Sequence, residues 1–252
     1  MFFKNYKKWE TEFAGRKFTL ETGKMAGLAN AAFLATYGET QVLCTVTASA
    51  KPREGIDFFP LSVDYEEKMY SVGKIPGSFL RREGRASEHA ILTSRCIDRP
   101  IRPLFPKDLR NDCSVVATVM SVDPDCSPEV TAAIGVSAAI AVSDIPWDGP
   151  ISSVNVGLVD GEIVLNPTLE QREKTDLTLT VASTADLVAM IEAGGNEIPD
   201  DVMFDCIMAG HEENKKMVQF IQGIVDEIGK PKFAYESSDP DPEILAEIED
   251  FC

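Results

Sequence analysis

Hydrophobic and polar residues alternate along much of the first third of the chain, which is the period of a half-buried β-strand. A turn signal stands between successive runs, so the pattern predicts a β-meander. The runs expected as strands are residues 9–13, 17–22, 31–36, 41–48 and 59–66. Residues 68–84 then break the alternation with three glycines and a proline. We expect a long loop there, of the kind that is often functional or mobile.

A helical period follows the loop. Ser87 is placed to cap this helix and Pro100 to end it. The residues expected in its buried stripe are Ala90, Ile91, Cys96 and Ile97. A second helix, made of small residues, is predicted over residues 128–142, where a proline at the first turn is tolerated.

Strand patterns and one long helix fill the rest of the chain. The expected strands are residues 114–122, 154–159, 162–165, 177–182 and 187–192, with a hairpin turn at Asp160 and Gly161. A helix is predicted over residues 198–228, with a break at Gly210 and His211. These elements together predict one α/β domain of the α+β kind, in which helices pack on mixed, largely antiparallel sheets.

The domain is expected to occupy residues 1–235. Beyond it, Asp239 and Pro240 open a second helical pattern, with an acidic cap and a proline in the first turn. The chain stops after about two turns of that helix, which are too few to be stable alone. Residues 236–252 are therefore predicted to be the start of a truncated helical linker.

Composition narrows the class of protein. A hydrophobic content of 44% in 252 residues can fill a sizeable core. No apolar leader follows Met1, and the longest run of small apolar residues, 132–142, is too short to cross a bilayer. The six cysteines form no CxxC pair, which indicates reduced and mostly buried thiols. We expect a soluble, cytoplasmic protein with no membrane partner.

The charge of the chain is unevenly distributed. A net charge of −17 argues against non-specific binding to nucleic acids, because such binding depends on neutralising phosphates. Residues 74–110, however, carry nine lysines and arginines against four acidic residues, while the C-terminal end is strongly acidic. An anionic partner would therefore meet the segment 74–110.

The sequence lacks the common catalytic signatures. It contains no GxxxxGK[ST] loop, no GxGxxG after a strand, no HExxH and no GxSxG. Asp123 and Asp125 could bind Mg²⁺, but such pairs at strand ends are more often turn residues, and we expect no metal site in the chain. The acidic residues at 57, 64, 66 and 67 are interpreted as a solvated face, and neither His89 nor His211 has the context of a general base.

The loop sequence has the composition of a site for single-stranded RNA. It places Phe79 and Leu80 next to Arg81 and Arg82, with Arg85 shortly after. A ring can stack on a base while guanidinium groups bind phosphates. The alternative is that the arginines of this region form structural salt bridges with nearby acids. Residue chemistry alone leaves the two readings equal.

Prolines recur at every third position over residues 100–106, which suits a polyproline II segment of three residues per turn. This geometry places Arg99, Arg102 and Phe105 along one edge. A different class of function follows from the same pattern, namely a PxxP segment that a partner protein docks.

Four segments resemble a known family. They read GETQVLCT at 38–45, FPLSVDY at 59–65, GKIPGSFLRREGR at 73–85 and RPIRPLF at 99–105. All four resemble polynucleotide phosphorylase, a family whose chains carry two RNase PH-like domains, and the match runs from about residue 9 to residue 232. The resemblance implies an RNase PH-like fold, similar to ribosomal protein S5 domain 2.

The resemblance also implies an activity. Members of this family degrade RNA from its 3′ end by phosphorolysis, releasing nucleoside diphosphates with Mg²⁺, in a homotrimeric ring. Phe79, Leu80, Arg81 and Arg82 match the FFRR-like loop that grips RNA at the entrance of the central channel, although Leu80 replaces the second aromatic residue. Arg85 belongs to the same predicted site. Further candidate phosphate or RNA contacts are Arg95, Arg99 and Arg102.

Departures from the family pattern indicate which half of such an enzyme this is. Catalytic halves carry aspartates and an Asp-x-Lys pair where this chain has Asp176, Thr178 and Thr180. A threonine lacks the charge that a divalent metal requires. The phosphate-binding serine run of the active half is also replaced, by Asp125, Cys126 and Ser127. The resemblance therefore implies a non-catalytic first domain with a degenerate site and no cofactor of its own.

Three hypotheses follow. The leading one is an RNA-binding scaffold, the N-terminal half of polynucleotide phosphorylase, whose partners are single-stranded RNA and a second RNase PH-like domain of the same chain in a homotrimer. Under that hypothesis, Mg²⁺ serves only the full-length enzyme. The second is that the chain is itself an active phosphorolytic exoribonuclease, with Asp123, Asp125 and Asp176 in an altered metal site. The third is the protein-interaction module with the PxxP segment.

Overall fold

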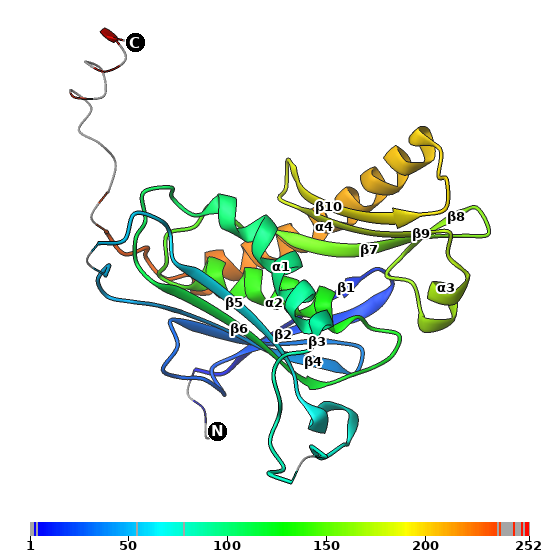
Figure 1. Ribbon diagram of the computed structural model, residues 1–252, viewed down its shortest axis with the longest axis horizontal. Coiled ribbons are helices and arrows are strands. Elements are labelled where there is room, and N and C mark those ends of the chain that lie inside the picture. Colours follow the sequence, from blue (N-terminus) through cyan, green and yellow to red (C-terminus); the bar gives the residue numbers. More distant parts are fainter. Residues whose placement is uncertain are drawn as a thin grey trace.

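Two β-sheets with helices between them form the fold (Figure 1). The computed structural model describes residues 3, 5–53, 55–77, 79–235, 237, 244, 248, 250 and 251. The larger sheet contains the first six strands and the smaller one the last four. A single hydrophobic core joins both sheets and the helices. This arrangement confirms the predicted α+β class with helices packed on mixed, largely antiparallel sheets.

The larger sheet contains the five strands of the predicted meander and one later strand. Its strands are β1 (Lys7–Phe13), β2 (Arg16–Thr22), β3 (Ala31–Tyr37), β4 (Thr40–Ala48), β5 (Leu61–Glu67) and β6 (Cys113–Ser121), in the spatial order β1-β2-β3-β4-β6-β5. Neighbours pair antiparallel except β5 and β6, which are parallel. A parallel pair needs a long crossover connection, and here that connection contains the predicted loop.

The smaller sheet is antiparallel throughout. It consists of β7 (Ser152–Val159), β8 (Glu162–Leu165), β9 (Leu177–Ser183) and β10 (Val188–Gly195), in the order β10-β9-β7-β8. The predicted turn joins β7 to β8, with Asp160 and Gly161 both at positive φ. This is the conformation that an Asp-Gly hairpin turn requires.

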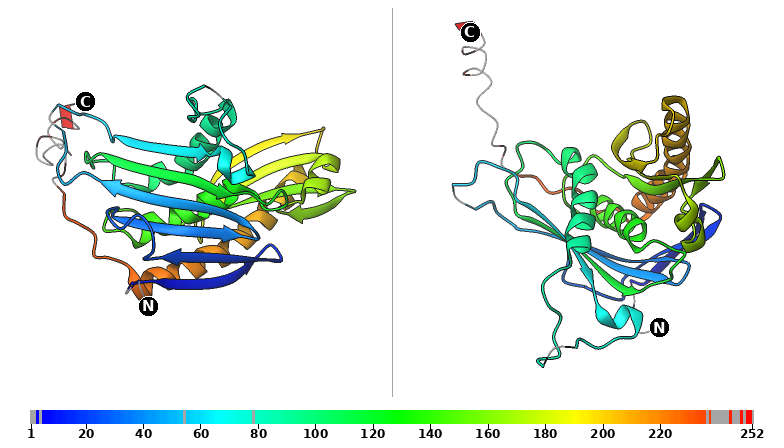
Figure 2. Two further views of the ribbon diagram at one scale, coloured as in Figure 1. Left: turned by 90° about the horizontal axis from the view of Figure 1, so that it is seen from below. Right: turned by 45° about the vertical axis from the view of Figure 1, so that its right-hand side comes forward.

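The helices join successive strands, and some of them lie between the two sheets. They are α1 (Glu88–Ile101), α2 (Pro128–Val142), the short α3 (Leu169–Lys174) and α4 (Asp200–Ile228), together with the 3₁₀ helices η1 (Met69–Val72) and η2 (Arg102–Leu104). Helix α2 packs against β3, β4 and β7, and α4 packs against β7 and β9. Figure 2 shows the broad face of the larger sheet with the helices behind it. The segments α3, η1 and η2 were not predicted.

Helix α2 is buried on all sides. Thirteen of its residues are buried, which fits a helix that is apolar all round and lies between two sheets. Gly135 lets α2 approach β3 and β4, because a Cβ there would stand 2.6 Å from Cys44 Sγ and 2.9 Å from Ala35 Cβ. The side chain of Ser127 caps its first turn through Val130 N.

The predicted break in the last helix is wrong. Helix α4 is continuous from Asp200 to Ile228, and Gly210 lies in its buried face. A Cβ on Gly210 would stand 3.0 to 3.2 Å from methyl groups of Val154, Val156 and Val181. The glycine is therefore explained by close packing of helix against sheet and does not end the helix.

Two details of the first helix are also corrected. Ile91 and Cys96 were expected in the buried stripe, but Ile91 is exposed and Cys96 is only half-buried. The 3.6-residue period instead buries Ala90, Thr93, Ile97, Pro100 and Ile101. The helix thus continues one residue past Pro100. The cap by Ser87 is confirmed, since its Oγ accepts a hydrogen bond from Ala90 N.

The polyproline II prediction is wrong as well. Residues 99–104 form the end of α1 and the helix η2. Phe105 is buried and lies 4.9 Å from Phe59 and 6.1 Å from Trp147, measured between ring centroids. Pro100 and Phe105 are buried in the protein's own core, whereas Pro103 is exposed. Because residues 99–104 are helical, the segment does not have the polyproline II conformation of a PxxP ligand.

The expectations for the cysteines, for membrane spans and for the C-terminal linker can be compared with the described residues only. Cys44, Cys113, Cys126 and Cys206 are buried free thiols, and Cys96 is a half-buried one, as predicted for these five. Within the described residues, no helix is both long enough and apolar enough to cross a membrane. The predicted linker over residues 236–252 lies almost entirely outside the described residues, and the division at residue 235 stays a prediction.

Candidate nucleic-acid interface

The loop between β5 and α1 projects from the body of the protein (Figures 1 and 2). It contains η1, which is followed by Gly73 in a left-handed conformation, and the described residues from there to Ser87 have no regular structure. Glu83 Oε1 accepts a hydrogen bond from Met69 N at 3.0 Å, so the returning arm of the loop is tied to η1. The loop is therefore held at its base while its tip reaches outward.

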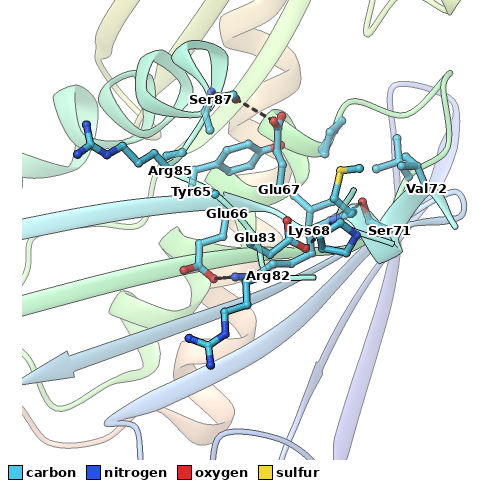
Figure 3. Close-up of a pocket in the computed structure, with 18 of the residues that line it drawn as sticks. Tyr65, Glu66, Glu67, Lys68, Ser71, Val72, Arg82, Glu83, Arg85 and Ser87 are labelled. Atoms are coloured by element: carbon cyan, nitrogen blue, oxygen red, sulfur yellow. Dashed lines mark hydrogen bonds and ion pairs between the residues drawn. The ribbon is translucent and has the colours of Figure 1, made fainter. Parts of the chain in front are cut away.

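Glu67 closes that base. Its Oε2 accepts a hydrogen bond from Ser87 Oγ at 3.1 Å (Figure 3). Its Oε1 lies 3.0 Å from Nδ1 of His89. The last residue of β5 is thus joined to the first turn of α1. Sequence reasoning treated Glu67 as part of a solvated face and gave His89 no role. The 21 residues between them leave no local signal of this contact.

The contact extends to the second helix. His89 Nε2 lies 3.4 Å from Glu129 Oε1, and Ser127 Oγ donates a hydrogen bond to the other oxygen of Glu129. Both Ser87 and Ser127 are helix caps. We call the residues Glu67, Ser87, His89 and Glu129 the base clasp, because they join β5, α1 and α2 beneath the loop.

A cavity of about 940 Å³ lies between the loop and the sheet. Figure 3 shows many of the side chains that line it. The apolar part of the lining comes from Tyr65, Met69, Val72, Pro76, Leu80, Ala90, Val119, Val122 and Pro128. Tyr65 is buried, and this burial raises the pKa of its hydroxyl, with a further contribution from the nearby carboxylates of Glu129 and Glu67.

Both acidic and basic side chains line the cavity, but only some of them have an ion-pair or hydrogen-bond partner. Lys68 pairs with Glu66 at 2.9 Å, and the hydrogen bond to that carboxylate raises the pKa of Lys68. Arg82 and Arg85 also line the cavity, and neither forms an ion pair or hydrogen bond within the described residues. In Figure 3 Arg85 lies at the upper left and Arg82 at the bottom, and both guanidinium groups extend outward from the other lining side chains.

The predicted loop residues divide into two sets. Arg81 adopts a left-handed conformation, with φ of 51°, which is uncommon for a residue with a Cβ. Leu80 and Arg82 line the cavity, whereas Phe79 and Arg81 are not among the described residues that do so. Phe79 is 99% exposed, so its ring has no packing role in the described part of the protein.

The arginines of α1 and η2 differ from those of the loop. Arg99 Nη1 donates a hydrogen bond to Glu192 Oε2 on β10 at 2.5 Å, and Arg102 forms a bidentate pair with Asp98. For these two residues the structural salt-bridge reading describes the geometry. Arg95 is exposed on α1 and, like Arg81, has no hydrogen-bond or ion-pair partner in the described segments.

The residues predicted to form a degenerate site lie elsewhere, on and just before β9. Thr178 and Thr180 are on the face of the smaller sheet turned away from α4, because the alternate residues Leu177, Leu179 and Val181 are buried in the core. Thr180 Oγ1 donates a hydrogen bond to Asn155 Oδ1 at 2.9 Å. Asp176, just before the strand, is exposed.

These residues do not fit a divalent metal. No group of three or more Cys, His, Asp or Glu side chains converges as a metal site anywhere in the described residues. Threonine hydroxyls and one amide supply no negative charge around Asp176, and hard cations such as Mg²⁺ bind through carboxylates.

The Asp123 and Asp125 pair serves a turn. Asp123 accepts hydrogen bonds from the backbone N–H groups of Asp125 and Glu39, and these bonds hold the pKa of its carboxyl below the usual range. Asp125 Oδ1 accepts a hydrogen bond from Leu169 N at 2.9 Å. The two carboxylates thus fix different backbone segments, as the turn interpretation predicted.

Comparisons with known proteins agree with this architecture. Residues 14–146 match the model of the 3′ exoribonuclease family, domain 1, and residues 149–213 match the model of domain 2 of that family. The solved structure of rice Rrp46 has the same fold, with a TM-score of 0.69 over 85% of this chain and 96% of the rice chain at 16% identity.

Curated relatives are far closer in sequence. The polyribonucleotide nucleotidyltransferase of Ruminiclostridium cellulolyticum is 59% identical over 98% of this chain, and that of Clostridioides difficile is 55% identical over 98%. In both cases the match covers 35% of the relative, so this chain spans about a third of their length. The chain belongs to the 3′ exoribonuclease family, where it corresponds to the N-terminal part of polyribonucleotide nucleotidyltransferases.

Proposed function

We propose that this chain is the RNA-binding and scaffold half of a polyribonucleotide nucleotidyltransferase that degrades RNA from its 3′ end by phosphorolysis. The observation that carries the proposal is the loop at 74–86. It presents the exposed ring of Phe79 beside Arg81, Arg82 and Arg85, which have no ion-pair partners in the described residues. Unpaired guanidinium groups next to an exposed ring suit the phosphates and bases of a single strand.

The arginines of the chain differ in whether they are paired with carboxylates, and this difference decides how much positive field each one contributes. An arginine already bonded to a carboxylate, such as Arg99 or Arg102, contributes little field at its surface. Loop arginines without such partners keep their full charge in a chain whose net charge is −17. A strand of RNA is therefore attracted to the loop and repelled by the acidic surfaces elsewhere.

The half is proposed to be non-catalytic. Thr178 and Thr180 leave Asp176 without the carboxylate and lysine neighbours that metal-assisted phosphorolysis needs. Phosphorolysis would then take place in a second RNase PH-like domain of the full-length chain, which would use Mg²⁺. We further propose that the full-length protein is a cytoplasmic homotrimer, in which the loops of three copies would guide RNA.

The RNA role is tested by replacing Arg81 and Arg82 together with alanine. We expect weaker binding of a single-stranded RNA and a salt dependence flatter by about two phosphate contacts. A matched control removes two positive charges elsewhere, with Lys51→Ala and Lys230→Ala, because both lysines are exposed and neither is in an ion pair within the described residues. It should leave both quantities nearly unchanged. Equal affinity and equal salt slope in the loop variant would remove the RNA role.

The catalytic question has a separate assay. The purified chain is incubated with single-stranded RNA, inorganic phosphate and Mg²⁺, and nucleoside diphosphates are measured. We expect none above the level of a Thr178→Ala, Asp176→Asn variant. Release of diphosphate by the parent chain and its loss in the variant would establish instead an active phosphorolytic exoribonuclease with an altered site.

A further inference from the structure

The cavity behind the loop is not needed for RNA to contact the loop tip. We propose that this cavity seats one nucleotide unit, with its base among the apolar side chains and its flanking phosphates toward Arg82 and Arg85. The proposal rests on the proposed function in that an RNA strand is one source of the nucleotide, and a free nucleotide is the other. The chemistry of recognition is the same for both.

Size is the first support. The cavity has a volume of about 940 Å³, near the upper end of the 300 to 1,000 Å³ that small-molecule sites usually have. A base with its sugar fits within such a volume. The cavity lies between a sheet and a projecting loop and is partly open to solvent, so a nucleotide within a strand could enter without threading.

The lining suits a flat, apolar-faced group. The inner wall is formed by Tyr65, Val119, Val122 and Pro128, and the loop side by Met69, Val72 and Leu80. Bases removed from a stack are commonly held between aromatic and aliphatic side chains of this kind. Val119 and Tyr65 are buried in the core of the sheet, so the inner wall is already fixed before a ligand binds.

The charges that remain available favour an anion. Each carboxylate of the lining already serves the protein: Glu66 pairs with Lys68, Glu67 joins the base clasp, and Glu83 accepts from Met69 N. Arg82 and Arg85 alone among the cationic lining residues lack such a partner in the described residues. Positive charge at two places on the outer edge of an apolar cavity suits a base inserted in the cavity with its phosphates outside.

The backbone explains how one loop can serve a strand and a cavity together. The left-handed conformation of Arg81 separates neighbours in sequence, so that Leu80 and Arg82 line the cavity while Phe79 and Arg81 do not. A strand lying on Phe79 and Arg81 would therefore have one nucleotide within reach of the cavity.

The test fills the cavity and leaves the loop tip intact. Val72→Trp places a large ring in the lining, at a residue exposed enough to accept it, and Ile75→Trp is the matched control because Ile75 is exposed in the same loop and does not line the cavity. The probe is uridine 3′,5′-bisphosphate, measured by calorimetry. The abasic bisphosphate of 1,2-dideoxyribose tests whether the base contributes.

We expect the bisphosphate to bind the parent chain and the Ile75→Trp variant equally, and the Val72→Trp variant about tenfold more weakly. The abasic probe should also bind about tenfold more weakly than the nucleotide. Equal binding by both tryptophan variants, or equal binding of both probes, would overturn the proposal. Val72→Glu provides a second variant, in which a carboxylate repels the phosphates, should the tryptophan variant not fold.

The two proposals fail separately. If the Arg81→Ala, Arg82→Ala variant binds RNA normally while Val72→Trp still loses the bisphosphate, the RNA role is removed and the cavity takes a free nucleotide. If the arginine variant loses RNA while Val72→Trp binds the bisphosphate as the parent does, the RNA role stands and the cavity is not a subsite. Competition between an RNA dodecamer and the bisphosphate identifies a strand as the source, and simultaneous binding identifies a free nucleotide.

Discussion

The carboxylate of Glu67, at the end of β5, lies 3.0 Å from Nδ1 of His89 in the first turn of α1. This contact joins two points separated by 21 intervening residues, among them every arginine of the loop. The two ends of the loop are therefore joined at its base, where Ser87 and Glu129 complete the clasp.

Removing the clasp should loosen the loop without unfolding the domain. We expect Glu67→Ala to lower the free energy of unfolding by about 1 kcal/mol, because two partly exposed hydrogen bonds are lost. Amide exchange over residues 74–86 should become faster. Asp64→Ala, an exposed residue of the same strand, is the control. Unchanged exchange in the Glu67 variant would show that the base clasp does not position the loop.

Two glycines of α4 should respond oppositely to the same substitution. Gly210→Ala places a methyl group 3.0 to 3.2 Å from three valines, and we expect a net loss of about 1 kcal/mol. Gly223→Ala meets nothing within 4 Å and should gain up to about 1 kcal/mol from helix propensity. Urea unfolding of both variants measures the difference. A stabilised Gly210 variant would contradict the close packing of α4 on the smaller sheet.

Acid stability should depend on Asp123. Hydrogen bonds from backbone N–H groups lower its pKa in the folded protein below the ordinary value of 3.8. The stabilisation is therefore present in full above that value and is lost as the pH falls through the lower folded pKa. Asp123→Asn should flatten the decline in stability between about pH 4 and pH 2. The exposed Asp57→Asn should keep the parent profile, and an unaltered decline in the Asp123 variant would argue against this turn.

The ion pair with Glu192 should keep the guanidinium group of Arg99 from binding an RNA phosphate. The pair is about half exposed, so a double-mutant cycle should give a coupling below about 1 kcal/mol. Glu192→Gln frees the guanidinium group and should steepen the salt dependence of RNA binding by about one phosphate contact. Glu162→Gln removes an exposed charge on β8 and is the control. No change in slope for Glu192→Gln would place Arg99 outside the path of RNA.

Local patterns predicted the strands and the main helices because alternation and helical period are set by burial on one face. The hairpin at Asp160 and Gly161 and the cap at Ser87 have local signatures of the same kind. The predictions at Gly210 and Pro100 failed because a helix breaker in sequence can be a packing residue in three dimensions. Only the distance to β7 and β9 distinguishes the two roles of Gly210.

Contacts between distant segments could not be predicted. Arg99 had several acidic candidates near it in sequence, yet its partner Glu192 lies 93 residues away. The cavity depends on how a loop without regular structure folds back over β5 and β6, and its lining residues share no periodic pattern. The loop composition predicted a site for RNA, whereas the base clasp and the cavity required the structure.

The parallel pairing of β5 with β6 has a mechanical consequence. Under the proposed function, an RNA strand drawn along the loop would pull on β5 at one end of the crossover and on α1 at the other. Helix α1 is bonded in turn to β10 through Arg99. β5 is registered against β6 over seven residue pairs, from Leu61 opposite Cys113 to Glu67 opposite Val119. A force along β5 would thus act on all the hydrogen bonds between β5 and β6 at once, and not on one bond after another. This geometry lets an edge strand resist being pulled from the sheet.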